Sequence, residues 1–449
     1  MPNTSARKGN HMDKPFDPNG WRYGDREDVL RQVEERFSKD PVLCTELEEA
    51  LIIGGGKAFG LRLCALVARS DQRLCVPPWR FVDAVSQMDL AREDLPIAEV
   101  LGELARDRDV IVRSSEPDED WGNPASGTAQ STVSASTPLA LAMAFGRASR
   151  DASSVVVQRI APGIGVVVDV VWSELLRRPI VRTKTGRMMR DTEGRIHYTS
   201  GTWDVEGLSR IWDPDSGEPL LPTHAGTQLT GDADRIPTGE IAYALARGLR
   251  ACDIAFGVQF EVVVHPDEPD VWNLVQMRPS PGAVRSAMPA APDTTILAVS
   301  PGTSHACDVR APMIPVTPRD ALDAMHFASG VEKPELVERM TGRILLWENI
   351  PTSEDYWIAA VSALSSAGVI GHITRGVMLI NTTHGMILRG QRSRNRSWDD
   401  INRRAAVVGV DTQAFETLHK LAKHTRTTVR IVSDGVVAHV SIPPPVSRR

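Results

Sequence analysis

Side chains of the types that bind phosphate and divalent cations recur along this chain, separated by apolar segments. In chain order they are Lys57, Arg113, Gln158, Glu261, Gln276 and Arg278. A guanidinium group grips phosphate bidentately and an ammonium group acts as a point charge. A carboxylate and an amide oxygen suit magnesium, which usually shares its coordination with substrate phosphates. The order of these residues favours a nucleotide site over a set of unrelated surface positions.

The first of them lies in a glycine-rich segment, GGGKAFGL, over Gly54–Leu61. Three glycines allow a tight turn and a close approach to a ligand, and we expect the following helix to offer free N–H groups to an anion. Lys57 could reach the same anion. The segment is not a Walker A loop, because Ala58 stands where a metal-binding Ser or Thr is needed. Since glycines before helices are common, an ordinary helix start is the alternative.

A short buried strand is predicted over 109–114, with the sequence DVIVRS, and it delivers Arg113 into a polar loop over 114–130. This arrangement suits a phosphate clamp, and the loop carries Gly127 and Thr128. The alternative is an acidic surface loop that follows a strand-end arginine.

Two further segments contribute strands. SVVVQRIAPG, over 154–163, predicts a buried strand with Gln158 near its end and a kink at Pro162, which suits a hinge that reads an adenine edge. An ordinary core strand is the alternative. Over 260–279 a predicted hairpin places Glu261 and Gln276 where both could reach one cation, with Arg278 further along the same face. Its alternative is a solvated edge hairpin.

In order, the motifs GGKAFGL, VIVRSSEPDEDW, VVVQRIAPG and FEVVV with NLVQMRP resemble the nucleotide-binding domain of the phosphoenolpyruvate synthase and pyruvate phosphate dikinase family, which is similar to that of rifampin phosphotransferases. The resemblance covers about residues 50–280. It implies that ATP and magnesium are the cofactors. By this resemblance Lys57 and Arg113 would hold the ATP phosphates, and Gln158 would lie near the adenine. Glu261 and Gln276 would ligate magnesium, and Arg278 would stabilise the charge on the transferred group. Gly127 and Thr128 would belong to the loop that covers the phosphates.

The family also uses a swivelling domain whose histidine carries phosphate. GRILLWENIPTSEDYW and SSAGVIGHITRG resemble the opening of that domain, and TTHGMILRG resembles its histidine motif. His384 is therefore the expected phosphocarrier, and an imidazole is a good nucleophile towards phosphorus. His372 and His305 remain rival candidates. No segment of the roughly 250 residues of the pyruvate-binding barrel follows, so we expect this chain not to form phosphoenolpyruvate by itself.

The expected fold class is α/β (α+β), with a two-lobed ATP-grasp-like nucleotide-binding domain followed by a smaller β/β/α swivelling phosphohistidine domain. The proline- and alanine-rich run PSPGAVRSAMPAAP marks the linker. The expected units are an arm over 1–24, the ATP-binding domain over 25–279, the linker over 280–294, the swivelling domain with a preceding insertion over 295–443, and a tail over 444–449.

The periodicity of apolar residues, together with turn and capping residues, predicts the individual helices and strands. The predicted helices cover 26–37, 238–252 and 353–366, and a further apolar-periodic run covers 58–67. The other predicted strands cover 165–172, 179–183, 259–264, 272–277, 343–347, 368–370, 427–433 and 436–442, with a hairpin turn over 267–270.

The composition of the chain limits the kinds of partner and the cellular location that we expect. The chain has 449 residues and a net charge of −6, with both signs interspersed, which gives no electrostatic case for nucleic-acid binding. Five scattered cysteines form no CxxC pair and fit a reducing cytoplasm. No stretch reaches the ~20 apolar residues of a membrane span, and the polar N-terminus does not resemble a secretory signal. We expect a cytoplasmic protein with a small-molecule acceptor or a separate acceptor protein.

Three functions fit these features. The first is a dikinase-type phosphotransferase that phosphorylates its own His384 from ATP, releases AMP, and passes the phosphate to an acceptor. The second is an ATP-driven condensing ligase that acts through a phosphorylated intermediate. The third is a nucleotide-binding protein with a degenerate carrier site and no catalysis.

Overall fold

The structure is a computed structural model, and it describes the larger part of the chain. The described residues are 21, 24–83, 104, 110–116, 121, 131–134, 143–146, 148, 154–185, 189–190, 196–197, 209–220, 235–280, 295–301, 306–348, 354–375, 405–410, 412–424, 427–435 and 437–442.

Helices and strands are interspersed along the chain and the strands form several sheets, so the fold is of the mixed α/β class. The helices are α1 Arg26–Phe37, α2 Pro41–Ile52, α3 Gly55–Ala68, α7 Thr238–Ala251, α8 Pro318–Ala328, α9 Pro334–Met340, α10 Glu354–Ser366 and α12 Thr412–His424. The strands are β1 Leu74–Cys75, β2 Trp79–Asp83, β3 Val110–Ser115, β4 Ser131–Ser134, β5 Ser154–Arg159, β6 Ile164–Ser173, β7 Arg178–Thr185, β8 Met189–Arg190, β9 Ile196–His197, β10 Ser209–Trp212, β11 Val258–His265, β12 Glu268–Pro279, β13 Thr295–Pro301, β14 Ala306–Val316, β15 Ile344–Trp347, β16 Gly371–Arg375, β17 Ala406–Val410, β18 Thr428–Asp434 and β19 Val437–Ile442.

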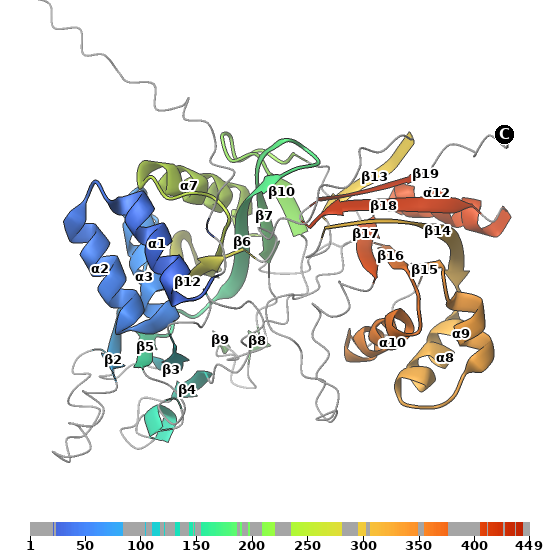
Figure 1. Ribbon diagram of the computed structural model, residues 1–449, viewed down its shortest axis with the longest axis horizontal. Coiled ribbons are helices and arrows are strands. Elements are labelled where there is room, and N and C mark those ends of the chain that lie inside the picture. The colour runs from blue at the N-terminus through green and yellow to red at the C-terminus, as the bar shows by residue number, and fades with distance from the viewer. Residues whose placement is uncertain are drawn as a thin grey trace, which may run out of the picture.

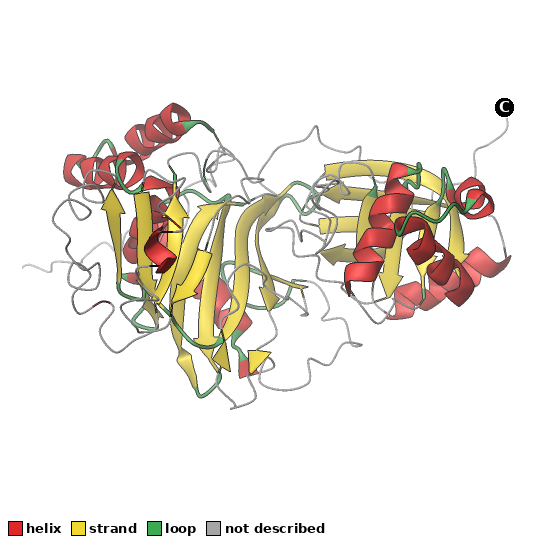
Figure 2. Ribbon diagram, turned by 90° about the horizontal axis from the view of Figure 1, so that it is seen from below, coloured by secondary structure: helices red, strands yellow, loops and turns green. Residues whose placement is uncertain are grey.

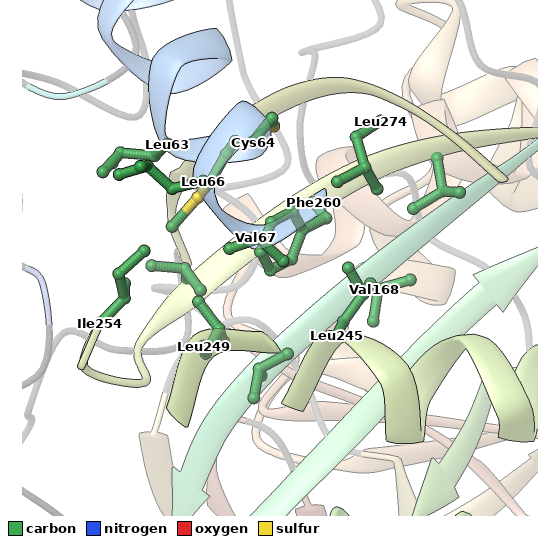
Figure 3. Close-up of a cluster of buried hydrophobic side chains, with 14 of the residues drawn as sticks. Leu63, Cys64, Leu66, Val67, Val168, Leu245, Leu249, Ile254, Phe260 and Leu274 are labelled. Carbon is green, nitrogen blue, oxygen red and sulfur yellow. The ribbon is translucent and has the colours of Figure 1, made fainter. Parts of the chain in front are cut away.

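A six-stranded sheet carries the largest core. Its order is β1-β12-β11-β6-β7-β10, and helices α3 and α7 pack on one of its faces (Figure 1). Val168, Phe260 and Leu274 of the strands belong to one buried cluster with Leu245 and Leu249 of α7 (Figure 3). Because strand side chains alternate between faces, the residues between these apolar positions point to the opposite face.

The long strands of this sheet are antiparallel except where β1 pairs with β12 in parallel. Figure 2 shows them as one curved layer next to a second group of strands. Between β11 and β12 the register shifts after Glu261, which pairs with Gln276, while Val262 pairs with Leu274. This β-bulge moves Val275 and Gln276 together away from the core that holds Leu274.

A four-stranded sheet of order β2-β5-β3-β4 lies on the other side of α3. Ala58 and Leu61 of α3 pack against Val156 of β5, whereas Phe59 and Leu63 belong to the core of the six-stranded sheet. Helix α3 therefore lies between the two sheets and sets their separation.

Two glycines allow the close packing of α3. A Cβ atom at Gly60 would lie 2.2 Å from the backbone oxygen of Met277 on β12. Gly55 has φ of +76°, and a Cβ there would lie 2.7 Å from the backbone oxygen of Ser115. The start of α3 and its second turn thus touch backbone directly, as the glycine-rich segment requires.

The C-terminal part forms a seven-stranded mixed sheet of order β13-β19-β18-β14-β15-β16-β17. Its parallel strands β14 to β17 are covered on both faces, by α12 on one and by α8, α9 and α10 on the other. Coverage of both faces is typical of parallel strands. The strands β13 and β14 and the helices α8 and α9 form the first part of this unit.

The turn between β18 and β19 contacts the six-stranded sheet. Asp434 Oδ2 accepts hydrogen bonds from Ser173 Oγ at 2.6 Å and from the Leu175 N–H at 3.0 Å. Val437 packs with Val171 and Ile180 on the face that α3 and α7 leave uncovered. The two large sheets therefore share a small interface that is apolar at its centre.

Most predicted elements are present, and their ends shift by a few residues. The strand predicted over 368–370 is wrong in position: Gly368 has φ of +96° and turns the chain, so β16 begins at Gly371. The hairpin turn predicted over 267–270 is shorter and lies earlier in the chain, because His265 of β11 already pairs with Glu268 of β12. Helices α2, α8, α9 and α12 have no counterpart among the predicted elements. Among the described helices, none combines the length and apolarity that a membrane crossing requires.

The glycine contact gives a test of this packing. Gly60→Ala should lower the free energy of unfolding by about 1–3 kcal/mol, because overpacking against a backbone oxygen outweighs the ~1 kcal/mol gained in helix propensity. Urea denaturation measures this change. Gly146→Ala is the control: an added Cβ at Gly146 meets nothing within 4 Å, so this variant should be as stable as the parent or slightly more so. Equal stability of the two variants would contradict the packing of α3 on β12.

Candidate functional site

The polar residues of the hairpin meet on the face of the six-stranded sheet opposite the helices. Glu261 pairs with Gln276 across β11 and β12, and Gln259 pairs with Arg278 two residues along the strands, on the same face. The β-bulge after Glu261 brings Gln276 and Arg278 to the same side as Glu261. The convergence expected from the sequence is thus present, and it depends on the bulge as well as on strand alternation.

Arg113 reaches this group from the other sheet. Its Nη2 donates a 2.9 Å hydrogen bond to Gln276 Oε1 and lies 3.9 Å from Glu261 Oε2. On the other side, Arg278 Nη2 lies 3.6 Å from Glu261 Oε1. Four of the six residues that the sequence indicated therefore form one contiguous cluster, built from β3, β11 and β12.

The cluster continues into a row of polar residues across the sheet. Arg278 donates to Gln259 Oε1 from Nε at 3.0 Å and from Nη2 at 2.7 Å. Gln259 Nε2 donates to Asp169 Oδ1 at 2.7 Å. Arg182 then holds Asp169 Oδ2, with Nε at 3.0 Å and Nη2 at 2.9 Å.

All of these side chains are buried, with at most 8% of the surface of any one exposed. Three arginines (Arg113, Arg182, Arg278) stand against two carboxylates (Asp169, Glu261), so this set carries one positive charge in excess. This balance of charge among the described side chains suits an anionic ligand.

Lys57 belongs to the same region by its backbone. Its N–H lies 3.3 Å from Ser115 Oγ, two residues beyond Arg113 on β3. Three residues later, Gly60 touches Met277 on β12. Since residues three apart share a helix face, the buried Lys57 lies on the α3 face that meets β12 between Gln276 and Arg278.

The expectation of free N–H groups at the start of α3 is wrong. The Gly56 N–H donates to the backbone oxygen of Glu116 at 2.8 Å, and the Lys57 N–H donates to Ser115 Oγ. The first turn is used to anchor the helix on the end of β3. Any phosphate contact from α3 would therefore come from the lysine side chain.

Gln158 lies in the four-stranded sheet, on the face that meets α3. It pairs with Ile111, two residues along the strands from the Arg113–Val156 pair. The side chain is buried, and its Nε2 donates to no hydrogen-bond acceptor among the described residues. A buried amide of this kind could bind a polar ligand edge, which fits the expected role near a base.

Four residues of the sequence analysis lie outside the part of the chain that the structure describes. They are Gly127, Thr128, His305 and His384. Their proposed roles stay predictions.

His372, the third histidine candidate, is described and is engaged at both ring nitrogens. Trp347 Nε1 donates to His372 Nδ1 at 3.1 Å, and Ser365 Oγ lies 3.1 Å from His372 Nε2. Burial lowers the pKa of His372 to about 3. The ring is therefore neutral with its proton on Nε2, and it serves the packing of β15, β16 and α10 rather than phosphate transfer.

The residues of the cluster fit a magnesium ion. Glu261 Oε2 is buried and accepts no hydrogen bond from any described residue, and Gln276 supplies a second oxygen beside it. No group of three or more His, Cys, Asp or Glu able to hold a metal occurs in the described ranges. Two protein oxygens leave the other positions to phosphate and water, which is how magnesium is commonly bound.

The sequence analysis missed Gln259, Asp169, Arg182 and Ser280. Asp169 was the detectable one: it is a single carboxylate inside the apolar strand IGVVVDVVW. A carboxylate in such a strand needs a buried partner. Arg182, on the next strand, is that partner, but only the register of β6 and β7 identifies it.

Comparisons with known proteins leave the family open. No family model matches this chain, and no curated protein sequence matches it. A D-alanine–D-alanine ligase from Bacillus anthracis is 11% identical, with a TM-score of 0.27 over 50% of this chain and 60% of that one. A D-Ala:D-Ser ligase from Enterococcus faecalis is 15% identical, with a TM-score of 0.27 over 49% and 51%. The Bacillus anthracis ligase solved with ATP is 9% identical, with a TM-score of 0.25 over 50% and 59%.

This chain thus covers less than two thirds of the length of those ligases, and the TM-scores are too low for the likeness to carry an argument. None of the comparisons shows the phosphoenolpyruvate synthase and pyruvate phosphate dikinase family. The resemblance of the motifs to that family therefore stays a prediction.

The buried histidine predicts how stability depends on pH. Between its usual pKa of 6.5 and its folded pKa of about 3, the unfolded chain binds a proton that the folded chain does not. The free energy of unfolding should therefore fall as pH falls through this range, by up to about 1.4 kcal/mol per pH unit for one group. His372→Gln should be less stable at pH 7 and should lose less stability between pH 6.5 and 4.5.

Urea denaturation at several pH values measures both slopes. His326→Gln, at an exposed position of α8, is the control and should keep the parent's slope. A His372→Gln slope equal to that of the parent would show that this histidine is not held neutral by burial.

Proposed function

We propose that this chain is an ATP- and magnesium-dependent enzyme with an ATP-grasp-like nucleotide site. In this proposal it activates an acceptor by phosphoryl transfer and condenses it with a second substrate. The observation that carries the proposal is the buried cluster of Arg113, Glu261, Gln276 and Arg278, assembled from three strands of two sheets. Such a set is costly to bury without a ligand that uses it.

Each residue has a role set by its chemistry. Lys57 and Arg113 would hold phosphate oxygens, one as a point charge and the other through its planar fork. Glu261 and Gln276 would ligate magnesium, which neutralises phosphate charge when bound. Arg278, fixed on its far side by Gln259, would meet the charge that develops on the transferred group.

In the transfer step an oxygen atom of the acceptor forms a bond to phosphorus. The bond from that phosphorus to the bridging oxygen breaks, and its electron pair leaves with the nucleotide. Arginine and lysine charges lower the barrier because they are in place before the charge moves. The phosphorylated acceptor would then be attacked by the second substrate, which releases the phosphate group.

Condensation requires partners for phosphate and for magnesium beside one another, and Arg113, Glu261, Gln276 and Arg278 supply both. A dikinase-type enzyme, in which His384 takes the phosphate and AMP leaves, is the second candidate. It is supported by the resemblance of TTHGMILRG to a phosphohistidine motif.

The magnesium role gives a direct binding test. Glu261→Gln keeps the size of the side chain and removes its charge, so the affinity for a Mg-bound non-hydrolysable ATP analogue should fall about tenfold or more, which is ~1.4 kcal/mol. Affinity for the same analogue in EDTA should change little. Isothermal titration calorimetry measures both.

Glu268→Gln is the matched control, because Glu268 lies at the exposed start of β12 on the same hairpin. It should bind like the parent in both conditions. A Glu261→Gln variant with unchanged dependence on magnesium would remove the metal from this cluster.

Product analysis separates condensation from the dikinase. Protein incubated with Mg-ATP is quenched in alkali and analysed by mass spectrometry, while ³¹P NMR follows the nucleotide. Condensation predicts no phosphohistidine, and His384→Ala should consume ATP at the parent's rate with candidate acceptors. Phosphate on His384, absent in His384→Ala and in Arg278→Ala, would instead establish the dikinase. Nucleotide binding without consumption under any condition would favour the non-catalytic protein.

A further inference from the structure

The polar row beyond the magnesium cluster is a cross-strand ladder at a single register. Arg182 of β7 is opposite Asp169 of β6, Asp169 is opposite Gln259 of β11, and Gln259 is opposite Arg278 of β12. Four consecutive strands each contribute one side chain on the same face. Every neighbouring pair in the row is joined by a hydrogen bond or ion pair between side chains.

The residues on either side of Gln259 determine which end of its amide donates and which end accepts. Arginine only donates and a carboxylate only accepts, whereas the glutamine amide has one accepting and one donating end. Asp169 accepts from Gln259 Nε2, so Gln259 must turn its Oε1 to Arg278. If the amide were reversed, its NH₂ group would face the guanidinium of Arg278, and that pairing would be lost.

Asp169 is itself held firmly. Its side chain is fully buried, and its Oδ1 also accepts a 2.9 Å hydrogen bond from Ser280 Oγ, while Arg182 occupies Oδ2. A buried carboxylate with this many donors stays charged and keeps one rotamer. Asp169 thus provides a rigid reference point two strands away from Arg278.

We propose that Asp169 is a positioning residue, which sets the amide of Gln259 and through it the guanidinium of Arg278 for phosphoryl transfer. This inference rests on the proposed function, because it gives Arg278 its role there. The hydrogen bonds of Asp169 given above go to Arg182, Gln259 and Ser280 and not to Lys57 or Arg113. Its effect should therefore fall on kcat more than on KM for ATP, since small misplacements of a catalytic group cost rate more than binding.

The row allows a rescue experiment. Asp169→Asn leaves Gln259 and Arg182 to compete for one amide oxygen. Gln259→Glu sets a carboxylate against Asp169, where the present contact is 2.7 Å. In the double variant the amide introduced at position 169 can accept from Arg182 and donate to the new carboxylate, which in turn accepts from Arg278. The double variant also restores the parent's net charge.

Steady-state ATP consumption is measured for the full chain, normalised to the folded fraction from circular dichroism. Each single variant should lower kcat about 10- to 100-fold and change KM for ATP by less than about threefold. The double variant should recover to within about fivefold of the parent. Such non-additivity is the sign that the two residues act through each other.

The control is Asp213→Asn, which removes a carboxylate from the Arg178–Asp213 ion pair at the far edge of the sheet. It should keep the parent's kcat. Single variants with the parent's kcat per folded molecule, even if they melt earlier, would overturn the proposal. So would a double variant that is as slow as the slower single variant.

A second readout needs no nucleotide. With ¹⁵N-labelled arginine, the Nε–H of Arg278 should give an exchange-protected signal because it is buried against Gln259, and Arg278→Lys assigns it. The signal should persist in the double variant and vanish in Asp169→Asn, where the Gln259 amide is no longer held in one orientation. If the parent consumes no ATP, the proposed function fails, and this signal alone decides the role of Asp169. Persistence of the signal in Asp169→Asn would overturn that role.

Discussion

The structure depends on the burial of charges on one face of a β-sheet and on the partners that make this burial tolerable. Asp169, Arg182, Glu261 and Arg278 are all inside the protein, where an unpaired charge would cost several kcal/mol. Each is matched by a group on the neighbouring strand, because the antiparallel register places them opposite one another. The register of these four strands therefore fixes the geometry of the candidate site. A slip of one residue would send every charge into the apolar core on the other face.

The same face also receives the C-terminal sheet. Arg182 Nη1 lies 3.4 Å from the backbone oxygen of Gly435, in the turn before β19, and Asp434 accepts from Ser173 next to it. The cluster and the polar row together therefore run from Arg113, in the four-stranded sheet, to the turn of a third sheet. A displacement of that turn would change the surroundings of Arg182 first, and Asp169 and Gln259 lie between Arg182 and the candidate phosphate site.

Helix α3 contributes in a different way. It lies between two sheets, and its glycines let it touch the backbone of both, at Ser115 and at Met277. Since its first N–H groups are already bound to the end of β3, its contribution to an anion site is the Lys57 side chain. The glycine-rich segment thus serves close packing, and this packing holds a lysine near the strands that carry Arg113 and Gln276.

The sequence alone indicated that Arg113, Glu261, Gln276 and Arg278 could act together, because each ends or interrupts an apolar segment at a strand-like spacing, and the structure brings their side chains together. The sequence also predicted most strands and the helices α1, α7 and α10, since local periodicity encodes which face of an element is buried. It did not predict that Gln276 joins Glu261 through a β-bulge, that α3 uses its N–H groups for packing, or that Asp169 and Arg182 extend the cluster. These features depend on which strands pair and at which register, and pairing joins residues that are far apart in the chain. Only the tertiary structure could decide them.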